Sequence, residues 1–425
     1  MVNVFIKKNK NYSKPLEYIL TVLSQNKFLK IAFLDEKNNC NLLFDHTDSQ
    51  SLLINTEFYT KLIDNSQFEF EIHFKQKPII LFPTTNEPDW LSTAFYMINS
   101  LQEYNCDSKR LDKYGRFKYE NSYQNKFNCI EENLVQKCFD NFVSQNSYLA
   151  NLEIKERATK VFISHDIDLI HGSFLQDGLW AIKKGRFDIV LKLIMNEIIR
   201  NPSWRNIDKI SKLHSLYDLK STFFWIATQK TSENKIKNAD YSMAEVSKLI
   251  QFSESNGLHK SCFPSSIDEE LSELPFETKL NRYHFLKFNL PNAYESIEAS
   301  QLNFDASLGF AERYGFRNNY GLPFKPYNFS TGKAYNFVEV PLNVMDVTLH
   351  KYMKVPTSDT SSKIIDFIEN HKTNSILSIL WHNNYFTDYK FSGYLQEYKK
   401  TLLYLHETKV ESITPTEIIK LYTYD

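Results

Sequence analysis

Acidic and histidine side chains follow several apolar runs in this sequence of 425 residues. The run 161–163 ends in the polar segment 164–168, which contains Asp166 and Asp168. Side chains alternate along an extended chain, so both carboxylates would point to the same side. One could then bind a metal ion while the other accepts a proton. The alternative is a strand-end turn or a helix cap, in which aspartate oxygens serve only as hydrogen-bond acceptors.

Three histidines and an arginine could join these carboxylates. His259 could bind zinc as a neutral imidazole, or it could be a hydrogen-bonded structural histidine. Arg282 and His284 stand two positions apart, and Arg282 could orient a carboxylate or a sugar, or hold the core through an ion pair. His382 ends the apolar run 376–381 and could act as a general acid, or cap a loop. This inventory, without a serine-centred nucleophile motif, favours metal-assisted hydrolysis.

The glycine count excludes several classes of enzyme. Only ten glycines are present, the first is Gly115, and none forms G-x-G-x-x-G or G-x-x-x-x-G-K-[ST]. Phosphate loops need glycine where the backbone approaches a phosphate. We therefore do not expect a P-loop NTPase, a protein kinase or a standard dinucleotide-binding fold.

Charge, cysteine content and hydropathy limit the partners and the location. Fifty basic and 51 acidic residues give a net charge of −1, so no global field would attract nucleic acid or anionic lipid. The five cysteines are widely spaced without C-x-x-C, which predicts neither a disulfide framework nor a thiolate zinc site. No apolar run approaches the ~18 residues that span a bilayer, and no export signal is evident. We expect a cytoplasmic protein without a transmembrane segment or a nucleic-acid partner.

Strands that alternate with helices must position the candidate residues. Such alternation predicts a parallel sheet with covered faces, either a barrel or a doubly wound sheet. The polar residues Asp166, Asp168, His259, Asp305, Asp346 and His382 each lie at the carboxyl end of an apolar run, which favours a (β/α) barrel. The strand-like runs are 161–163, 222–226, 258–259, 304–305, 337–344, 376–381 and 412–413.

Helical signals lie between these runs. Ser242 and Glu245 have the spacing of a capping box, and Gly257 suits the end of that helix. After His259 we expect further helix through Leu286. The segment 175–200 is amphipathic, and we expect it to pack against the barrel, although a lid or a membrane-surface helix has the same pattern.

The residues before the barrel form a region of mixed character. The run 79–82 resembles a strand, and 90–104 has helical periodicity. We therefore predict a smaller α/β domain over residues 1–150 and a distorted (β/α) barrel over residues 151–425.

Short motifs in a set order resemble the polysaccharide deacetylase superfamily, the NodB-homology fold of carbohydrate esterase family four. The similarity extends from about residue 90 to residue 422 and is greatest for a divergent branch with an uncharacterised N-terminal domain. The motifs are Ser-His-Asp-Ile-Asp, Ser-Thr-Phe-Phe-Trp, Gly-Leu-His-Lys-Ser, Arg-Tyr-His-Phe-Leu, Asp-Ala-Ser-Leu-Gly-Phe, Tyr-Gly-Phe-Arg, Pro-Leu-Asn-Val-Met-Asp and Leu-Trp-His-Asn, between residues 164 and 383, with Tyr-Gly-Arg-Phe at 114–117.

The resemblance implies a role for each matching residue. Asp166 would be the catalytic base and Asp168 the metal carboxylate. His259 would be the first metal histidine, and Arg282 would steady the base at the substrate side of the site. His382 would protonate the leaving group. At the remaining matched positions, Asp305, Arg317 and Trp381 would contact substrate.

Two departures from the family pattern concern the metal. The family's adjacent Asp-Asp pair is Asp-Ile-Asp here, and its second metal histidine is replaced by Phe263. His284 could supply the missing ligand from the next segment. If it does not, two protein ligands remain instead of the usual three for catalytic zinc.

The family implies a divalent metal, commonly zinc, and removal of acetyl groups from sugars. We expect an acetylated saccharide, such as a nucleotide- or lipid-linked precursor, as the substrate. The alternatives are hydrolysis of a non-sugar amide, and an inactive descendant that binds glycan or a partner protein at the same rim.

Overall fold

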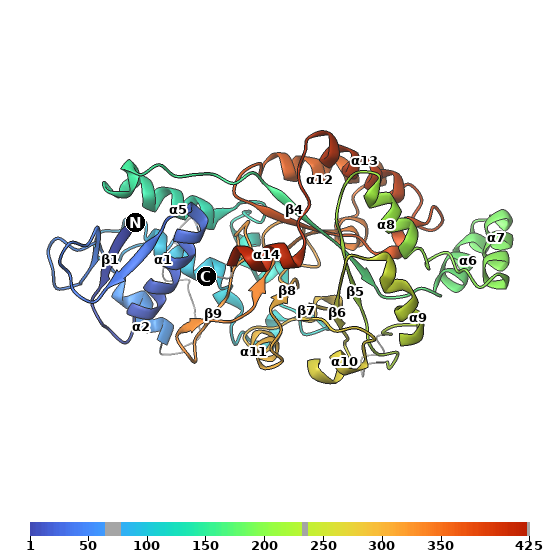
Figure 1. Ribbon diagram of the computed structural model, residues 1–425, viewed down its shortest axis with the longest axis horizontal. Helices are drawn as coiled ribbons and strands as arrows, with labels where there is room; N and C mark the ends of the chain where they lie inside the picture. The colour runs from blue at the N-terminus through green and yellow to red at the C-terminus, as the bar shows by residue number, and fades with distance from the viewer. Residues whose placement is uncertain (64–77, 232–236, 423–425) are drawn as a thin grey trace.

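Two parallel sheets organise this α/β protein, whose computed structural model describes residues 1–63, 78–231 and 237–422 (Figure 1). The larger sheet has eight strands in the order β11-β8-β7-β6-β5-β4-β13-β12, and every pairing in it is parallel. Its strands are β4 (Lys160–Ile167), β5 (Thr222–Trp225), β6 (Ser255–Lys260), β7 (Leu280–Tyr283), β8 (Phe304–Asp305), β11 (Val338–Glu339), β12 (Leu342–Met345) and β13 (Ile376–Leu380).

The two edges of this sheet are joined by the chain itself. β11 and β12 are the edge strands, yet only Val340 and Pro341 separate them in sequence. A link this short spans roughly 10 Å at most, so the edges lie side by side. The amide of Val340 donates to the carbonyl of Asp305 at 2.8 Å, across the end of β8. The sheet is therefore curled into a barrel-like arc, in agreement with the predicted parallel architecture.

Helices connect and cover these strands. Between β4 and β5 the chain forms α6 (Ser173–Lys183), α7 (Phe187–Ile198) and α8 (Ile207–Ser215). The later helices are α9 (Met243–Leu249), α10 (Ile267–Glu273), α11 (Asn292–Ala299), α12 (Thr360–Glu369), α13 (Tyr394–Glu407) and α14 (Pro415–Tyr422). The predicted capping box is confirmed, since Ser242 and Glu245 exchange both hydrogen bonds at the start of α9.

The helix expected after His259 and through Leu286 is wrong over most of its length. α10 ends at Glu273, and the chain then forms β7, which pairs with β6 and β8 on its two sides. Pairing on both sides outweighs the local helical pattern. Gly257 does not end a helix but lies within β6, where an added Cβ would approach the Phe224 ring to 2.6 Å. The run 79–82 contributes one isolated bridge rather than a described strand.

The smaller sheet lies in the first 44 residues. It has three parallel strands in the order β2-β1-β3. Its strands are β1 (Val2–Ile6), β2 (Ile31–Leu34) and β3 (Leu42–Phe44), and the helices that follow or separate them are α1 (Ser13–Lys27), α2 (Thr56–Ile63), α3 (Trp90–Ile98), α4 (Tyr123–Lys126) and α5 (Leu134–Gln145).

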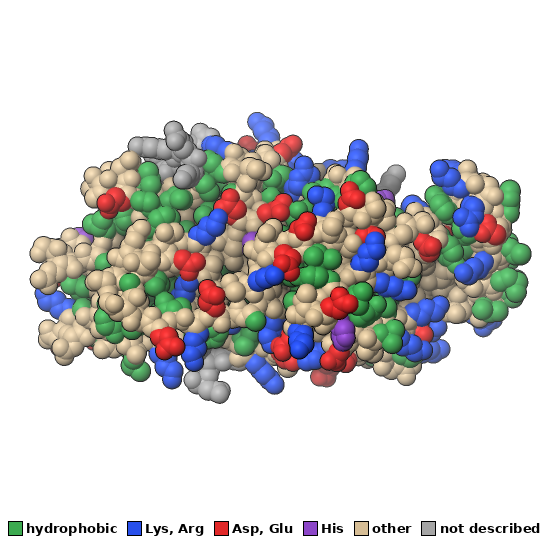
Figure 2. Space-filling model, turned by 90° about the horizontal axis from the view of Figure 1, so that it is seen from above, with side chains coloured by type: hydrophobic (Ala, Val, Ile, Leu, Met, Phe, Trp, Pro, Cys, Tyr) green, Lys and Arg blue, Asp and Glu red, His purple; other side chains and the backbone are tan. Residues whose placement is uncertain are grey.

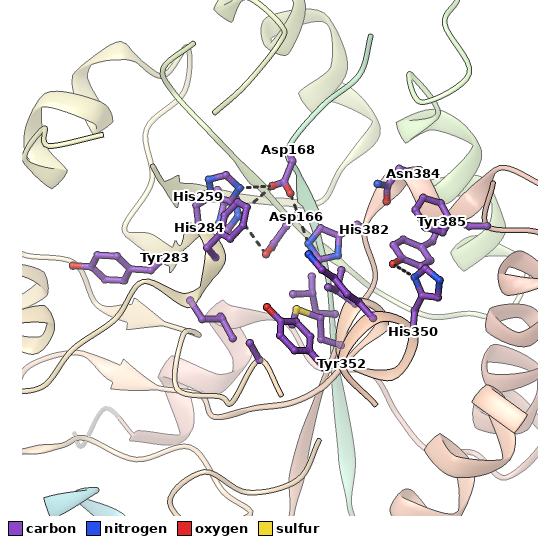
Figure 3. A pocket seen from close by; sticks show the side chains of 18 of the residues that line it. Asp166, Asp168, His259, Tyr283, His284, His350, Tyr352, His382, Asn384 and Tyr385 are labelled. Carbon is purple, nitrogen blue, oxygen red and sulfur yellow. Dashed lines mark hydrogen bonds and ion pairs between the residues drawn. The ribbon is translucent and has the colours of Figure 1, made fainter. Parts of the chain in front are cut away.

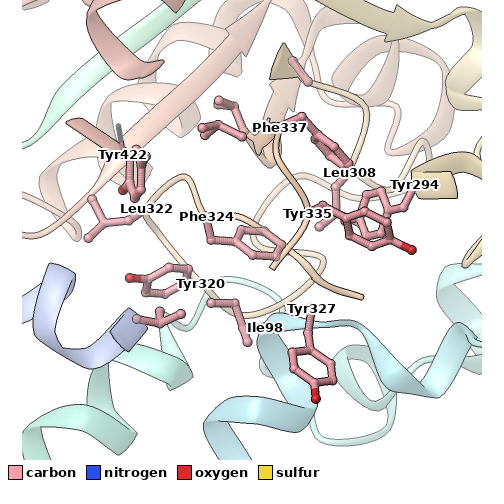
Figure 4. Packing of buried hydrophobic residues seen from close by; sticks show 14 of the residues in the cluster. Ile98, Tyr294, Leu308, Tyr320, Leu322, Phe324, Tyr327, Tyr335, Phe337 and Tyr422 are labelled. Atoms are coloured by element: carbon pink, nitrogen blue, oxygen red, sulfur yellow. The ribbon is translucent and has the colours of Figure 1, made fainter. Parts of the chain in front are cut away.

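One apolar core extends from this region into the larger sheet. The same buried cluster contains Ile98 of α3 and Tyr327 and Phe324 of the segment after β8 (Figure 4). Tyr327 begins β9 (Tyr327–Asn328), which pairs with β10 (Lys333–Ala334). Residues on both sides of position 150 therefore belong to one apolar core. The division into two domains at this position stays a prediction.

α6 and α7 do not pack as expected. They pack against each other through Ala181 and Leu193, with Tyr389 beside them, and form a hairpin at the end of the molecule opposite β1 (Figure 1). Their outward apolar side chains are exposed, including Leu191 at 62%. The expectation that this apolar face covers the barrel is therefore wrong.

Candidate metal centre and active site

A cavity of about 440 Å³ lies at the carboxyl ends of five strands of the large sheet. Asp166, Asp168, His259, His284 and His382 line it together and point toward one another (Figure 3). They come from the ends of β4, β6, β7 and β13 or the residues just after them. The parallel arrangement brings these ends to one rim, as in (β/α) barrels.

The Asp-Ile-Asp spacing sets the direction of both carboxylates. Asp166 lies in β4 and Asp168 just after it, so the two side chains share one side of the strand. The intervening Ile167 is buried on the opposite side. His165 also turns away, and its Nδ1 donates to the carbonyl of Trp381 at 2.6 Å.

Asp168, His259 and His284 form a group that could hold a metal ion. One ligand atom from each residue lies within 4.8 Å of the others. Asp168 Oδ1 is 3.4 Å from Nε2 of His259 and 3.6 Å from Nε2 of His284. Both separations exceed an ordinary N–H···O hydrogen bond. The positive charge of the histidines outweighs burial and holds the pKa of Asp168 well below its usual range.

Hydrogen bonds on the far side of each ring favour metal ligation. Nδ1 of His259 donates to the carbonyl of Arg282 at 3.0 Å, and Nδ1 of His284 donates to Oδ1 of Asn238 at 3.3 Å. With a metal ion bound, each ring would be neutral and its Nε2 would face the ion beside Asp168. Such outer partners orient metal-binding histidines. Asp168 Oδ1 is buried without a hydrogen-bond partner among the described residues, which suits an atom that would bind a cation.

These donors suit a divalent ion of the zinc type. Two imidazoles and one carboxylate are a common ligand set of catalytic zinc, with a further position open. Phe263 stands four residues after His259 and does not line the cavity. His284 enters instead from the first position after β7, next to β6. Three protein donors are thus present despite the substitution.

Asp166 is held as an ionised carboxylate beside this group. Nη1 of Arg282 donates to its Oδ1 at 2.9 Å, and Nε of the same arginine donates to the carbonyl of Ala306 at 2.8 Å. Burial alone would raise the pKa of Asp166, but His259 and Arg282 outweigh it, and the pKa is lowered. An anchored, unprotonated carboxylate can accept a proton.

His382 is held in the opposite protonation state. Its Nδ1 lies 2.7 Å from Oδ1 of Asp346, and its backbone amide donates to the other oxygen of that carboxylate at 2.6 Å. Burial opposes the charged ring, yet Asp346, Asp168 and Asp166 outweigh it and raise the pKa of His382 to about 10. A protonated imidazole that faces the cavity can act as an acid.

Three predicted substrate residues lie away from the cavity. Asp305 is buried at 0% exposure and accepts from Nδ2 of Asn281 at 2.6 Å. Arg317 is buried against Glu103, with Nε 3.0 Å from its carboxylate, and Trp381 packs on Tyr398. None of the three lines the cavity, so their contact with substrate stays a prediction. Arg282 does not line the cavity either, but it donates to Asp166, which does.

Other lining residues were not assigned from the sequence. Asp346, which the sequence places on the rim without a role, does not line the cavity but holds His382 from behind. Arg116 lines the cavity although it precedes residue 150, and its Nη1 donates to the carbonyl of Phe285 at 2.9 Å. The Tyr-Gly-Arg-Phe motif was the available signal. Tyr352 and Tyr385 add aromatic walls, and nothing distinguishes them in sequence from the other tyrosines of a chain with 25.

Comparisons with known proteins give a family match in the first third of the chain and a structural similarity over a longer part of it. Residues 4–145 match a family described as a family of unknown function, DUF7033. No curated protein matches the sequence. One similar solved structure is described as a candidate polysaccharide deacetylase from Mycobacterium smegmatis. It aligns over 63% of this chain and 90% of its own, at 11% identity and a TM-score of 0.39. Among the described residues, no helix has the length and apolar character to cross a membrane.

Proposed function

We propose that this protein is a metal-dependent hydrolase that removes acetyl groups from an acetylated sugar, using a distorted barrel of the polysaccharide-deacetylase type. The observation that carries the proposal is the group of Asp168, His259 and His284, with Asp166 and His382 at its sides. A base kept ionised and an acid kept protonated share one cavity with a possible metal site. Opposed protonation states of this kind assign the acid and the base of a hydrolase.

The side chains would divide the reaction between them. A divalent ion, for which zinc is our proposal, would polarise the acetyl carbonyl when bound by Asp168, His259 and His284. Asp166 would accept a proton from the attacking water while Arg282 holds its carboxylate in place. His382 would donate a proton to the departing nitrogen or oxygen. The C–N or C–O bond breaks, and acetate and a free amine or hydroxyl leave.

The shape of the cavity supports a saccharide substrate. Its volume lies within the usual range for small-molecule sites. Tyr283, Tyr352, Tyr385 and Phe391 line it, and aromatic rings present an apolar face with a polar edge, which suits a sugar ring. We propose an acetylated saccharide, free or linked to a nucleotide or lipid. Arg116 lies in the predicted N-terminal domain, which would thus contribute a side chain to the site of the predicted barrel.

Acetate release from acetylated amino sugars tests this proposal. We expect wild-type activity, and a loss of about 10²- to 10⁴-fold in both Asp166→Asn and His382→Ala, because each variant lacks one proton-transfer group. His406→Ala is a matched control, since His406 is exposed and bonds only to the carbonyl of Tyr217. Equal rates in all four proteins would reject the assigned roles.

Metal analysis of the same proteins tests the ligand set. We expect about one divalent ion per wild-type chain and much less in His284→Ala, whereas His406→Ala should retain it, because a site that loses one of three donors binds weakly. A wild-type protein without metal, and without acetate release after zinc, cobalt or nickel is added, would contradict the enzyme and favour an inactive binding protein.

A further inference from the structure

The helical hairpin of α6 and α7 exposes a large apolar face. Phe187, Leu191 and Ile198 of α7 are 70%, 62% and 69% exposed. Their neighbours on the two helices are exposed as well: Phe174, Leu175, Leu179, Ile182, Ile194, Met195 and Ile199. Figure 2 shows hydrophobic side chains gathered at the outer end of this hairpin. Soluble proteins seldom expose so many neighbouring apolar side chains without an interaction to serve.

This face is additional to the one that holds the hairpin together. Ile189 and Leu193 lie four residues apart and are buried at the contact with α6. Phe187, Leu191 and Ile198 recur at helical spacing on the opposite side of α7. A surface helix normally has one apolar stripe, and a helix with apolar residues on both sides is normally covered on both. The described residues leave the second stripe of α7 uncovered.

The hairpin carries an excess of positive charge. Residues 173–200 contain five Lys or Arg and three Asp or Glu, a difference of +2 in a chain whose net charge is −1. Asp177 is buried and accepts from Nε1 of Trp204 at 2.9 Å, and Asp188 is paired with Arg186 at 2.7 Å. The exposed Lys183 and Lys184 are left at the turn of the hairpin, next to the apolar stripe.

A basic hollow lies beside α7. Its volume is about 550 Å³, and four lysines line it: Lys192, Lys209, Lys212 and Lys399. Asp388 is the one acidic side chain among its described lining residues, and its carboxylate accepts from the amide of Gly393 at 2.9 Å. The hollow can therefore accept negatively charged groups such as phosphates.

We propose that the α6–α7 hairpin docks the protein on the surface of an anionic lipid bilayer. The exposed aliphatic and phenylalanine side chains enter the boundary of the acyl chains, and the surrounding lysines contact lipid phosphates. Helices that combine an apolar face with Lys and Arg beside it bind membranes in this manner. A protein partner fits less well, because protein interfaces are depleted of Lys, and lysines adjoin this face. The exposed apolar residues include Phe but neither Tyr nor Trp, and Trp180 of α6 is partly buried against the hairpin core.

The hairpin is continuous with the candidate active site. Gln176 of α6 lines the cavity of Asp166 and His382. Docking through the outer face would therefore hold this cavity near the headgroups, within reach of a lipid-linked molecule. Membrane binding itself does not depend on the proposed hydrolase activity, because it rests on the exposed faces of α6 and α7.

Vesicle co-sedimentation of the full chain tests the proposal. We expect the protein to pellet with phosphatidylcholine vesicles that contain phosphatidylglycerol, and about tenfold less with phosphatidylcholine alone or at high salt. The triple variant Phe187→Ser, Leu191→Ser, Ile198→Ser should lose binding by tenfold or more, since three apolar groups no longer enter the bilayer. The double variant Lys183→Gln, Lys184→Gln should weaken binding to the vesicles that contain phosphatidylglycerol and leave binding to phosphatidylcholine vesicles unchanged.

A matched triple variant controls for the loss of exposed apolar surface. Leu53, Leu403 and Leu421 are 50%, 42% and 46% exposed at other places. Their replacement by serine should leave binding unchanged. Failure of the wild type to pellet, or equal pelleting of the hairpin variant, would overturn the proposal. A dimer that the hairpin variant abolishes, without vesicle binding, would instead identify a second copy of the chain as the occupant. Acetate release is measured separately, so neither result decides the other proposal.

Discussion

Asp166 and His382 differ in protonation because their neighbours differ. Arg282 contributes a positive charge to the first, and Asp346 contributes a negative charge to the second. Asp166 is buried and the side chain of His382 is only 13% exposed, so solvent screens these charges little. The two partners thereby prepare one proton acceptor and one proton donor in the same cavity.

The pKa of His382 leads to a prediction about pH. The acid form is required, so activity should persist below the pKa and be lost as the pH rises through it, at about 10 in the wild type. Asp346→Asn removes the carboxylate that raises the pKa most while burial continues to lower it. We expect the alkaline decline of kcat to move to lower pH in this variant. The measurement is the pH profile of acetate release.

The exposed Asp359 provides the control for that profile. Asp359→Asn should reproduce the wild-type profile, because this side chain lies on the surface at the start of α12. An Asp346→Asn profile that matches the wild type would show that Asp346 does not set the protonation of His382.

At the scale of elements, the register of β6 and β7 positions the proposed ligands. His259 pairs with Arg282, and His284 follows at the end of β7. Gly257 permits this close arrangement, since a Cβ there would lie 2.6 Å from the ring of Phe224 and 3.0 Å from Cβ of Leu280. The same ring lies 4.6 Å from the guanidinium of Arg282.

Gly257→Ala should therefore affect stability and activity together. Overpacking of this kind costs about 1–3 kcal/mol in the free energy of unfolding. Displacement of Phe224 should also shift Arg282 and reduce acetate release. Urea unfolding measures the first effect. Gly178→Ala is the control, because its nearest neighbour would be 3.9 Å away and alanine favours a helix by about 1 kcal/mol. Equal stability of the two variants would contradict the proposed close packing.

At the scale of the whole molecule, buried polar contacts join the two parts of the chain. Arg317 and Glu103 are fully buried partners that lie 214 residues apart in sequence. Gln124 donates to the carbonyl of Arg317 at 2.8 Å and continues this contact. With the shared apolar core, these bonds favour cooperative unfolding of the whole protein.

Glu103→Gln should destabilise the entire molecule. It leaves the guanidinium of Arg317 buried without its carboxylate, which costs about 3–5 kcal/mol. We expect circular dichroism and fluorescence to report the same single unfolding transition, at a lower denaturant concentration than in the wild type. Glu132→Gln removes a surface partner of Lys137 and should cost less than about 1 kcal/mol. Two separate transitions, or equal effects of the two substitutions, would contradict the shared packing.

The sequence by itself determined the features that depend on a few neighbouring residues. The capping box of Ser242 and Glu245 and the proline at the start of α14 are local, and both are present. The alternation of strands with helices indicated a parallel sheet, and the polar residues at the ends of the apolar runs indicated a common rim. Even the shared side of Asp166 and Asp168 follows from the alternation of an extended chain.

Tertiary structure decided the features that depend on residues far apart. His284 joins His259 because β7 pairs with β6, whereas the local pattern favoured a helix there. Asp346 contacts His382 because β12 and β13 are neighbouring strands. Arg116 lines the same cavity although it lies far from both residues in the sequence. The apolar face of α6 and α7 has the same periodicity whether it is covered or exposed. Periodicity records which residues share a face, and only packing between distant elements decides what that face meets.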